Sequence, residues 1–250
     1  MITIGETGGH GTFAKVLAGI EVLRRNHIPF AILCVLSSAN IDSPEELFYF
    51  FASLVPRVVA FNVEELEGFN KQSSLQDRRK FPQLVRFFDI YLKLCEENGF
   101  PHRVREFEQA SRFFASCLQG NQVKSDVAIP FRILNIDHAG NFSTFSPELM
   151  DTLDSRFGNF FLGNILDGKP EDVVDSNKLK RMHEEITAGV DMCAKTCEYF
   201  RICGGGAPVN KLAELGTFAG TETAFCRNST KAIATAMTDR IVRDLRSASR

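Results

Sequence analysis

The cysteines near the C-terminus place the strongest constraint on how this chain can fold. Three of them, Cys193, Cys197 and Cys203, lie within eleven residues, and three glycines (Gly204–Gly206) follow the third. The fourth, Cys226, comes after a spacer of small and polar residues. Thiols spaced this closely would crowd one another as apolar core filler, so we expect the fold to bring them to a shared metal or to oxidised partners.

The composition is that of a globular protein without a basic surplus. The 250 residues are 44% hydrophobic and 24% charged, which allows a sizeable core. The net charge of −2 argues against nucleic acid as a partner, because phosphates need cations to neutralise them. No signal peptide is recognisable, and no run approaches the roughly 20 apolar residues that cross a membrane. We therefore expect a cytoplasmic protein, in which a cysteine cluster more often means metal than disulfides.

The four cysteines leave three possibilities: a [4Fe–4S] cluster, a zinc ion, or no ligand. A cluster takes four thiolates and is stabilised by nearby backbone N–H groups, which Gly204–Gly206 can bring close. A structural zinc site usually presents two tight Cys-x2-Cys pairs, whereas here three cysteines are grouped and one is distant. The spacing favours iron–sulfur and leaves zinc and free cysteines open. Cys34, Cys95 and Cys117 lie in apolar or helical segments, where we expect core positions.

The N-terminal half alternates helices with short apolar strands. The helical period predicts a helix over 13–25, with Thr12 as its N-cap. The nearly continuous apolar run at 29–36 predicts a strand buried on both faces. Helix-start signals predict a second helix over 43–54, and 57–62 is the next strand. This alternation predicts βαβ units, hence a parallel sheet or an α/β barrel.

The remaining elements suggest a change of organisation near residue 140. The pattern predicts helices over 77–98 and 103–118, a hairpin formed by 131–137 and 142–145, a helix over 177–190 and a final helix from about residue 229. We therefore expect one domain at 1–140 and a second at 141–250. About three strands are few for a closed barrel, so the first half of the barrel is expected to be missing.

Polar residues follow two of the predicted strands. Ser38 comes after the first, and Asn62 and Glu64 lie at the end of the second. Ligands collect at the carboxyl ends of parallel strands, so these residues are candidate cofactor-binding positions, with exposed loop residues as the alternative. Arg105 and Glu106 are interpreted as a pair on a helix surface.

These segments resemble radical SAM enzymes with a SPASM domain, which modify ribosomally made peptides. The Cys-x3-Cys-x5-Cys-Gly-Gly-Gly pattern with its distant Cys226 resembles their auxiliary-cluster region, and Leu-Gly-Asn-Ile at 162–165 is similar to their Gly-Asn-Ile turn. The sequences at 11–13, 29–38 and 61–65 resemble the second half of a radical SAM partial barrel.

The resemblance extends to a subfamily. Residues 61–68, 73–75 and 105–107 are most similar to the cyclophane-forming maturases that act on Gly-rich-repeat precursor peptides. The intact enzyme would then cross-link side chains of a ribosomally synthesised precursor peptide through a carbon–carbon bond.

The resemblance implies an α/β fold: the C-terminal half of a radical SAM partial (β/α)6 barrel, followed by a small SPASM-type auxiliary iron–sulfur domain. It implies one auxiliary [4Fe–4S] cluster with four ligands, namely Cys193, Cys197, Cys203 and Cys226. No second auxiliary cluster is expected, because Ala207 stands where the family usually has a further cysteine. Serine and threonine replace the cysteines that flank the Gly-Asn-Ile turn in the family.

The chain departs from the family at its other end. It contains no Cys-x3-Cys-x2-Cys motif, so S-adenosylmethionine and a second [4Fe–4S] cluster are expected only in the intact enzyme, where Ser38, Asn62 and Glu64 would be cofactor-binding. The chain alone is expected to be inactive, with a longer reading frame or a separate polypeptide supplying the missing barrel half. The alternatives are a non-catalytic zinc-stabilised peptide-binding module and a degenerate fragment.

Overall fold

The computed structural model describes residues 11–66, 70–121 and 123–248. The end of the segment 61–68 thus lies outside the described residues. The chain divides into two compact units, which we call the sheet unit and the cysteine unit. The sheet unit comprises Met1–Glu64, Ser74–Ser111 and Ala232–Arg250, and the cysteine unit comprises Glu65–Ser73 and Arg112–Lys231. The domain boundary near residue 140 stays a prediction.

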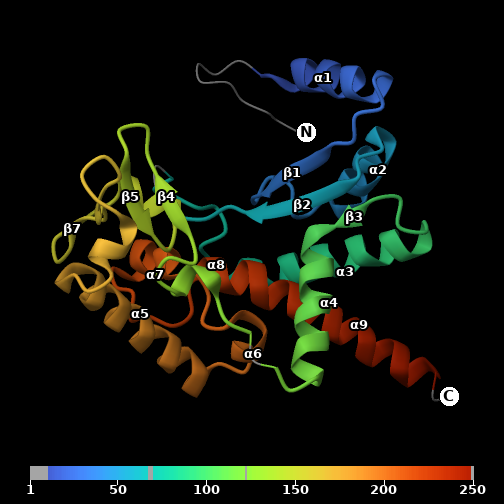
Figure 1. The fold of residues 1–250 in the computed structure, drawn as a ribbon. Coiled ribbons are helices and arrows are strands. Elements are labelled where there is room, and N and C mark those ends of the chain that lie inside the picture. Colours follow the sequence, from blue (N-terminus) through green and yellow to red (C-terminus); the bar gives the residue numbers. More distant parts are fainter. Residues whose placement is uncertain (1–10, 67–69, 122, 249–250) are drawn as a thin grey trace. The chain divides into compact units, whose positions relative to one another are not determined.

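The sheet unit combines a small parallel sheet with helices (Figure 1), which agrees with the predicted α/β class. Its elements are α1 (Phe13–Arg25), β1 (Ala31–Leu36), α2 (Pro44–Leu54), β2 (Val58–Val63), α3 (Phe81–Glu97), β3 (Arg103–Val104), the start of α4 (Arg105–Leu118) and α9 (Ala232–Ala248). The strand order is β1-β2-β3, and both pairings are parallel, with Ala31 opposite Val58 and Val58 opposite Arg103. The alternation of helix and apolar strand therefore predicted the sheet type correctly.

Aromatic side chains form the core of the sheet unit. Phe61 on β2 lies against Phe87 and Tyr91 on α3, with ring centroids 5.3 and 4.9 Å apart at steep interplanar angles. Phe48 on α2 meets Tyr91 edge to face at 5.4 Å. All four rings are almost completely buried. Burial of such large rings, with edge-to-face geometry, stabilises the packing of β2 against α2 and α3.

The C-terminal helix α9 belongs to this unit and packs along α3 (Figure 1). Two ion pairs connect α9 to α3: Arg240 contacts Glu96, and Arg243 contacts Asp89. A segment from the end of the sequence thereby joins elements formed by its first hundred residues.

Strand β1 differs from the prediction in its burial. Its apolar run was expected to be buried on both faces, but Leu33 is 60% exposed and Val35 is 55% exposed. Among the described strands, β1 pairs only with β2, so it stands at the edge of the sheet. The prediction of a doubly buried strand is wrong for this structure, because one face and one edge of β1 carry no packing partner in the described chain.

The cysteine unit has two small antiparallel sheets and several helices (Figure 1). Its elements are β4 (Leu134–Ile136), β5 (Asn141–Thr144), β6 (Leu153–Asp154), β7 (Gly158–Asn159), β8 (Gly163–Asn164), α5 (Asn177–Thr196), α6 (Phe200–Cys203), α7 (Pro208–Leu215) and α8 (Ala224–Cys226). Pairing of β4 with β5 confirms the predicted hairpin, and β8 adds to β5. An apolar core, to which Phe145, Phe160 and Phe218 contribute, lies against α5 and α7.

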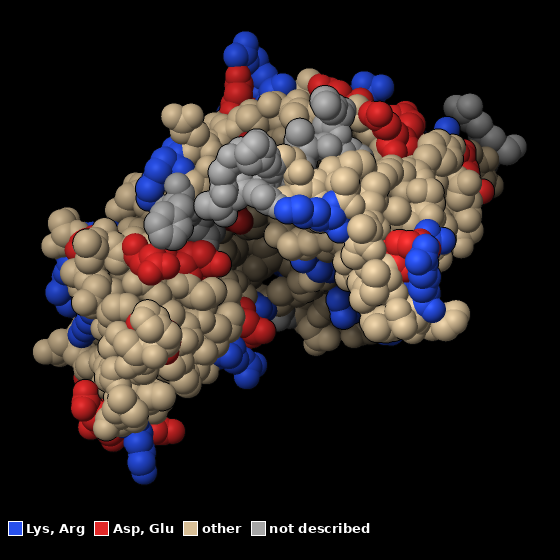
Figure 2. Space-filling view, turned by 90° about the horizontal axis from the view of Figure 1, so that it is seen from above, with Lys and Arg blue, Asp and Glu red and all other residues tan. Residues whose placement is uncertain are grey.

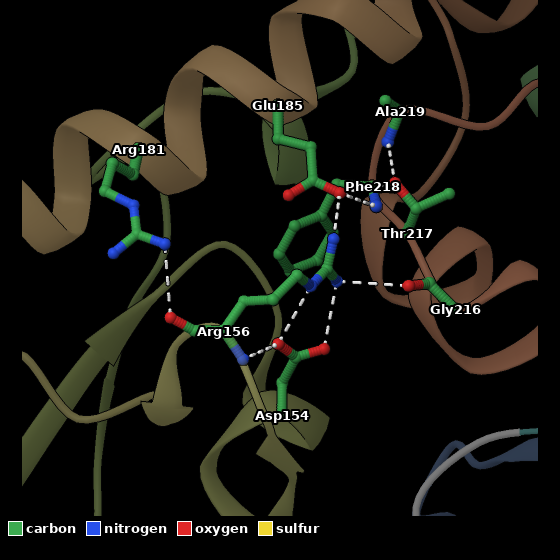
Figure 3. Close-up of polar contacts among 8 residues, drawn as sticks. All are labelled: Asp154, Arg156, Arg181, Glu185, Gly216, Thr217, Phe218 and Ala219. Carbon is green, nitrogen blue, oxygen red and sulfur yellow. Dashed lines mark hydrogen bonds and ion pairs between the residues drawn. The ribbon is translucent and has the colours of Figure 1, made fainter.

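A network of ion pairs and hydrogen bonds around Arg156 connects separate segments of this unit (Figure 3). Arg156, just after β6, pairs with Asp154 at 2.9 Å and with Glu185 on α5 at 2.7 Å. The Glu185 carboxylate also accepts the backbone N–H of Phe218 at 3.0 Å. The hydrogen bond from Arg156 lowers the pKa of Asp154, so this carboxylate stays charged at neutral pH.

The described residues contain no helix that is both long and apolar enough to span a membrane. On the face in Figure 2, basic and acidic residues lie interspersed among uncharged ones.

Candidate functional site

Each of the four cysteines near the C-terminus sits at or near the end of a helix. Cys193 lies in the last turn of α5, and Cys197 caps that helix with an extended backbone. Cys203 is the last residue of α6, and Cys226 is the last residue of α8. The sequence predicted α5 only as far as residue 190; its continuation to residue 196 is what places Cys193 on the helix.

All four cysteines line one cavity of about 180 Å³ in the cysteine unit. This space is many times the roughly 15 Å³ that one water molecule needs by the same measure. The cavity wall also includes Gly205, Gly206, Lys211, Glu222, Thr223 and Lys231. The structure therefore gathers cysteines that are up to 33 positions apart in the sequence around a space that could hold a ligand of several atoms.

The three glycines after Cys203 adopt backbone conformations that favour glycine. Gly204, Gly205 and Gly206 have φ values of 63°, 101° and 74°, a region that side chains disfavour. A Cβ on Gly204 would lie 2.6 Å from the carbonyl oxygen of Val123. Gly206 lines the cavity and has no atom within 4 Å of where its Cβ would be. The glycine turn thus brings bare backbone to the cavity wall.

The thiols of this cavity lie within electrostatic reach of one another. Burial, with a smaller contribution from the neighbouring Cys203, raises the pKa of Cys226 to about 12. Burial also raises the pKa of Cys203, with smaller contributions from Cys197 and Cys193. Burial thus disfavours the thiolate forms of Cys203 and Cys226, and a bound cation would favour them.

The described part of the chain contains no group of three or more His, Cys, Asp or Glu side chains close enough to hold a metal ion. A single tetrahedral ion needs sulfurs about 2.3 Å from one centre. A four-iron cluster instead binds one thiolate at each of four irons, so its ligands stand farther apart around a wider space. The four cysteines that line the cavity match such a cluster in the number and type of their donors.

The other three cysteines lie away from this cavity. Cys95 is completely buried in α3, which confirms its predicted core position. Cys34 and Cys117 are only half-buried, and the Cys117 thiol donates to the carbonyl oxygen of Arg201 at 3.1 Å.

A second cluster of polar groups lies at the carboxyl ends of β1 and β2 in the sheet unit. The Glu64 carboxylate accepts hydrogen bonds from the backbone N–H and the hydroxyl of Ser74, at 2.7 and 2.6 Å. The Ser74 hydroxyl in turn accepts the backbone N–H of Ser38 at 2.9 Å. Ser38 and Glu64, which the sequence singled out separately, are therefore joined through Ser74.

Asn62, the third of these candidates, is held by an arginine. The Arg105 guanidinium donates to Asn62 Oδ1 at 2.7 Å and contacts the Glu106 carboxylate at 2.6 Å. Glu106 is only 7% exposed, and its burial raises its pKa. The interpretation of Arg105 and Glu106 as a surface pair is wrong, because α4 begins directly after the buried end of β3 and turns Glu106 inward.

Sequence reasoning missed Ser74, Lys211 and the bridging role of Arg105. Ser74 lies in a loop, and Lys211 lies in a short helix, where a charged residue ordinarily faces solvent. The resemblance of residues 73–75 to the maturases was a signal for Ser74, whereas the burial of Lys211 depends on tertiary packing that the sequence does not show.

The chain is similar to known proteins in sequence and in fold. No protein-family model matches the chain. The chain is 37% identical over 219 residues to the uncharacterized protein sll1766 of Synechocystis sp., and the match covers 88% of this chain and 54% of that protein. The chain thus spans about half the length of this curated relative.

Among solved structures, anSMEcpe with bound AdoMet is similar, with a TM-score of 0.66 and 19% identity over 97% of this chain and 61% of that chain. The structure of anSMEcpe with bound AdoMet and the Kp18Cys peptide is similar with a TM-score of 0.63 and 17% identity, covering 97% of this chain and 65% of that one. At this level of identity the likeness concerns the fold: the chain folds in a way similar to about three fifths of anSMEcpe.

Proposed function

We propose that this chain holds one [4Fe–4S] cluster in its cysteine cavity and forms part of a radical SAM enzyme that modifies a peptide. The observation that carries the proposal is the convergence of Cys193, Cys197, Cys203 and Cys226 on one cavity. Their four sulfurs are the donor set that such a cluster takes. When bound, the cluster would supply one-electron transfer.

The residues of the cavity wall support this assignment. Gly206 presents backbone without a side chain, which lets N–H groups approach sulfide atoms. Lys211 and Lys231 both line the cavity, and their positive charges suit a site that gathers four thiolates. Zinc remains the competing ligand, and it becomes an outcome of the test below.

The fold likeness supports the wider role. The similar structures are of anSME, an anaerobic sulfatase-maturating radical SAM enzyme, and they contain AdoMet and, in two of them, a peptide. We propose that the intact enzyme likewise binds AdoMet and acts on a peptide. The resemblance of the segment 61–68 to cyclophane-forming maturases makes a ribosomally synthesised precursor peptide the proposed substrate, and a side-chain carbon–carbon cross-link the proposed product.

The sheet unit would provide part of the AdoMet site. Ser38, Asn62 and Glu64 gather polar groups at the carboxyl ends of two parallel strands, where the amino, carboxylate and ribose groups of AdoMet could find partners. The exposed apolar side chains of β1 would pack against further strands, supplied by a longer chain or by a separate polypeptide.

Radical generation is not expected of this chain by itself, because it has no Cys-x3-Cys-x2-Cys motif. Reduced protein incubated with AdoMet should therefore release no 5′-deoxyadenosine above a protein-free control. Release of 5′-deoxyadenosine that depends on this chain would contradict the proposal that radical generation needs another part of the enzyme.

Metal analysis of the anaerobically purified chain tests the proposal. We expect about four irons and four acid-labile sulfides per chain, with a broad visible absorption that bleaches on reduction. A colourless protein with one zinc per chain would rule out the cluster and favour a zinc-stabilised binding module.

A further inference from the structure

Lys211 occupies an unusual position for a lysine. It lies on α7, is only 3% exposed, and lines the cysteine cavity. Its Nζ lies 3.6 Å from Cys193 Sγ, a hydrogen-bonding distance for sulfur. Lys231, the other lysine of the cavity wall, instead pairs with the Glu222 carboxylate at 2.6 Å.

Within the described residues, no ion pair joins Lys211 to Asp or Glu. A buried ammonium is strongly unfavourable unless an opposite charge or good acceptors surround it, and a neutral thiol is a weak acceptor. A thiolate at Cys193, held by a metal centre, would supply the missing negative charge.

We propose that Lys211 tunes the reduction potential of the cluster through Cys193; this inference rests on the proposed cluster. Its ammonium donates a hydrogen bond to the Cys193 sulfur and adds a positive charge beside the cluster. Both effects stabilise the form that has gained an electron, because that form carries more negative charge. Lys211 is thus a positioning and tuning residue and touches no substrate in this proposal.

The test is a redox titration of the reconstituted full chain, followed by electron paramagnetic resonance. The cluster gains one electron from the mediator in each variant, so midpoint potentials compare directly. Lys211→Met keeps the length of the side chain and removes its charge, whereas Lys211→Arg keeps the charge. Lys180→Met removes an exposed lysine of α5 and serves as the matched control.

We expect Lys211→Met to lower the ratio of reduced to oxidised cluster about tenfold at a fixed potential, which equals about 59 mV for a one-electron couple. Lys211→Arg and Lys180→Met should stay close to the unaltered protein. A Lys211→Met protein that folds but loses its iron, while Lys211→Arg keeps it, supports the same electrostatic role.

Two results overturn the inference while the cluster itself stands. One is equal midpoint potentials for Lys211→Met and Lys180→Met at full iron content. The other is loss of iron from Lys211→Met and Lys211→Arg alike, which would indicate a packing role. If the unaltered chain takes up no iron and sulfide, the proposed cluster fails, and this inference fails with it.

Discussion

The sheet unit and the cysteine unit use their buried space in opposite ways. In the sheet unit, rings such as Phe61 and Tyr91 pack closely against one another in a buried aromatic core. In the cysteine unit, an apolar core is accompanied by a cavity whose wall is made of thiols, lysines and glycine backbone. Hydrophobic burial explains the first arrangement, whereas the second makes physical sense around a charged ligand.

The largest expected effect separates the cavity cysteines from the others. The four cysteines that line the cavity are Cys193, Cys197, Cys203 and Cys226. Replacing any one of them with alanine should reduce bound iron from about four per chain to a small fraction, because each supplies one cluster ligand. Cys34→Ala and Cys117→Ala, outside the cavity, should retain full iron content. Iron and sulfide assays on protein purified without oxygen measure the difference. Equal iron content in all six variants would show that the cavity cysteines do not hold the iron.

The next effect addresses the aromatic core. Phe61→Ala should destabilise the chain by about 3–5 kcal/mol, because it removes a ring packed against several others. Val22→Ala, at a 58% exposed position on α1, should change stability by less than about 0.5 kcal/mol. Urea unfolding gives both values. Phe61→Ala protein that remains folded should keep its iron. Loss of iron from the folded variant would show that iron binding in the cysteine unit depends on the aromatic core of the sheet unit.

Two helical glycines, Gly189 in α5 and Gly19 in α1, differ in how closely other atoms pack against them. Gly189→Ala in α5 places a Cβ 2.2 Å from the carbonyl oxygen of Phe218, so we expect a loss of about 1–3 kcal/mol. Gly19→Ala in α1 meets nothing within 4 Å and should stabilise by roughly 0.5–1 kcal/mol through the better helix propensity of alanine. Opposite signs in thermal unfolding support the packing described for α5; stabilisation in both variants contradicts it.

The smallest expected effect is a pH dependence within the sheet unit. His102 Nε2 lies 2.9 Å from the Tyr91 hydroxyl in the core, and burial lowers the pKa of His102. The unfolded chain therefore takes up the proton first, near pH 6.5, so stability is retained above that pH and lost as the pH falls below it. We expect the free energy of unfolding, measured with urea, to fall as the pH drops from 6.5 to 5.5. His102→Gln should flatten this slope, and an unchanged slope would assign the effect to other groups.

The sequence predicted the elements better than their surroundings. Helix 13–25, the parallel pairing and the hairpin followed from local patterns, which report backbone preference and alternation. The exposure of Leu33 did not, because burial depends on what packs against a strand. The same holds for the inward turn of Glu106 and for Lys211 beside Cys193, since both depend on tertiary contacts that no local pattern encodes.

Mössbauer spectroscopy of the full chain, purified or reconstituted with ⁵⁷Fe under anaerobic conditions, is the strongest test of whether the four cysteines hold one cluster. We expect nearly all bound iron to belong to a single type of [4Fe–4S] cluster, at about four irons per chain, and Cys226→Ala to abolish this signal. Iron found only as isolated ions, or a spectrum unchanged in Cys226→Ala, would contradict the claim that the four cysteines hold one cluster.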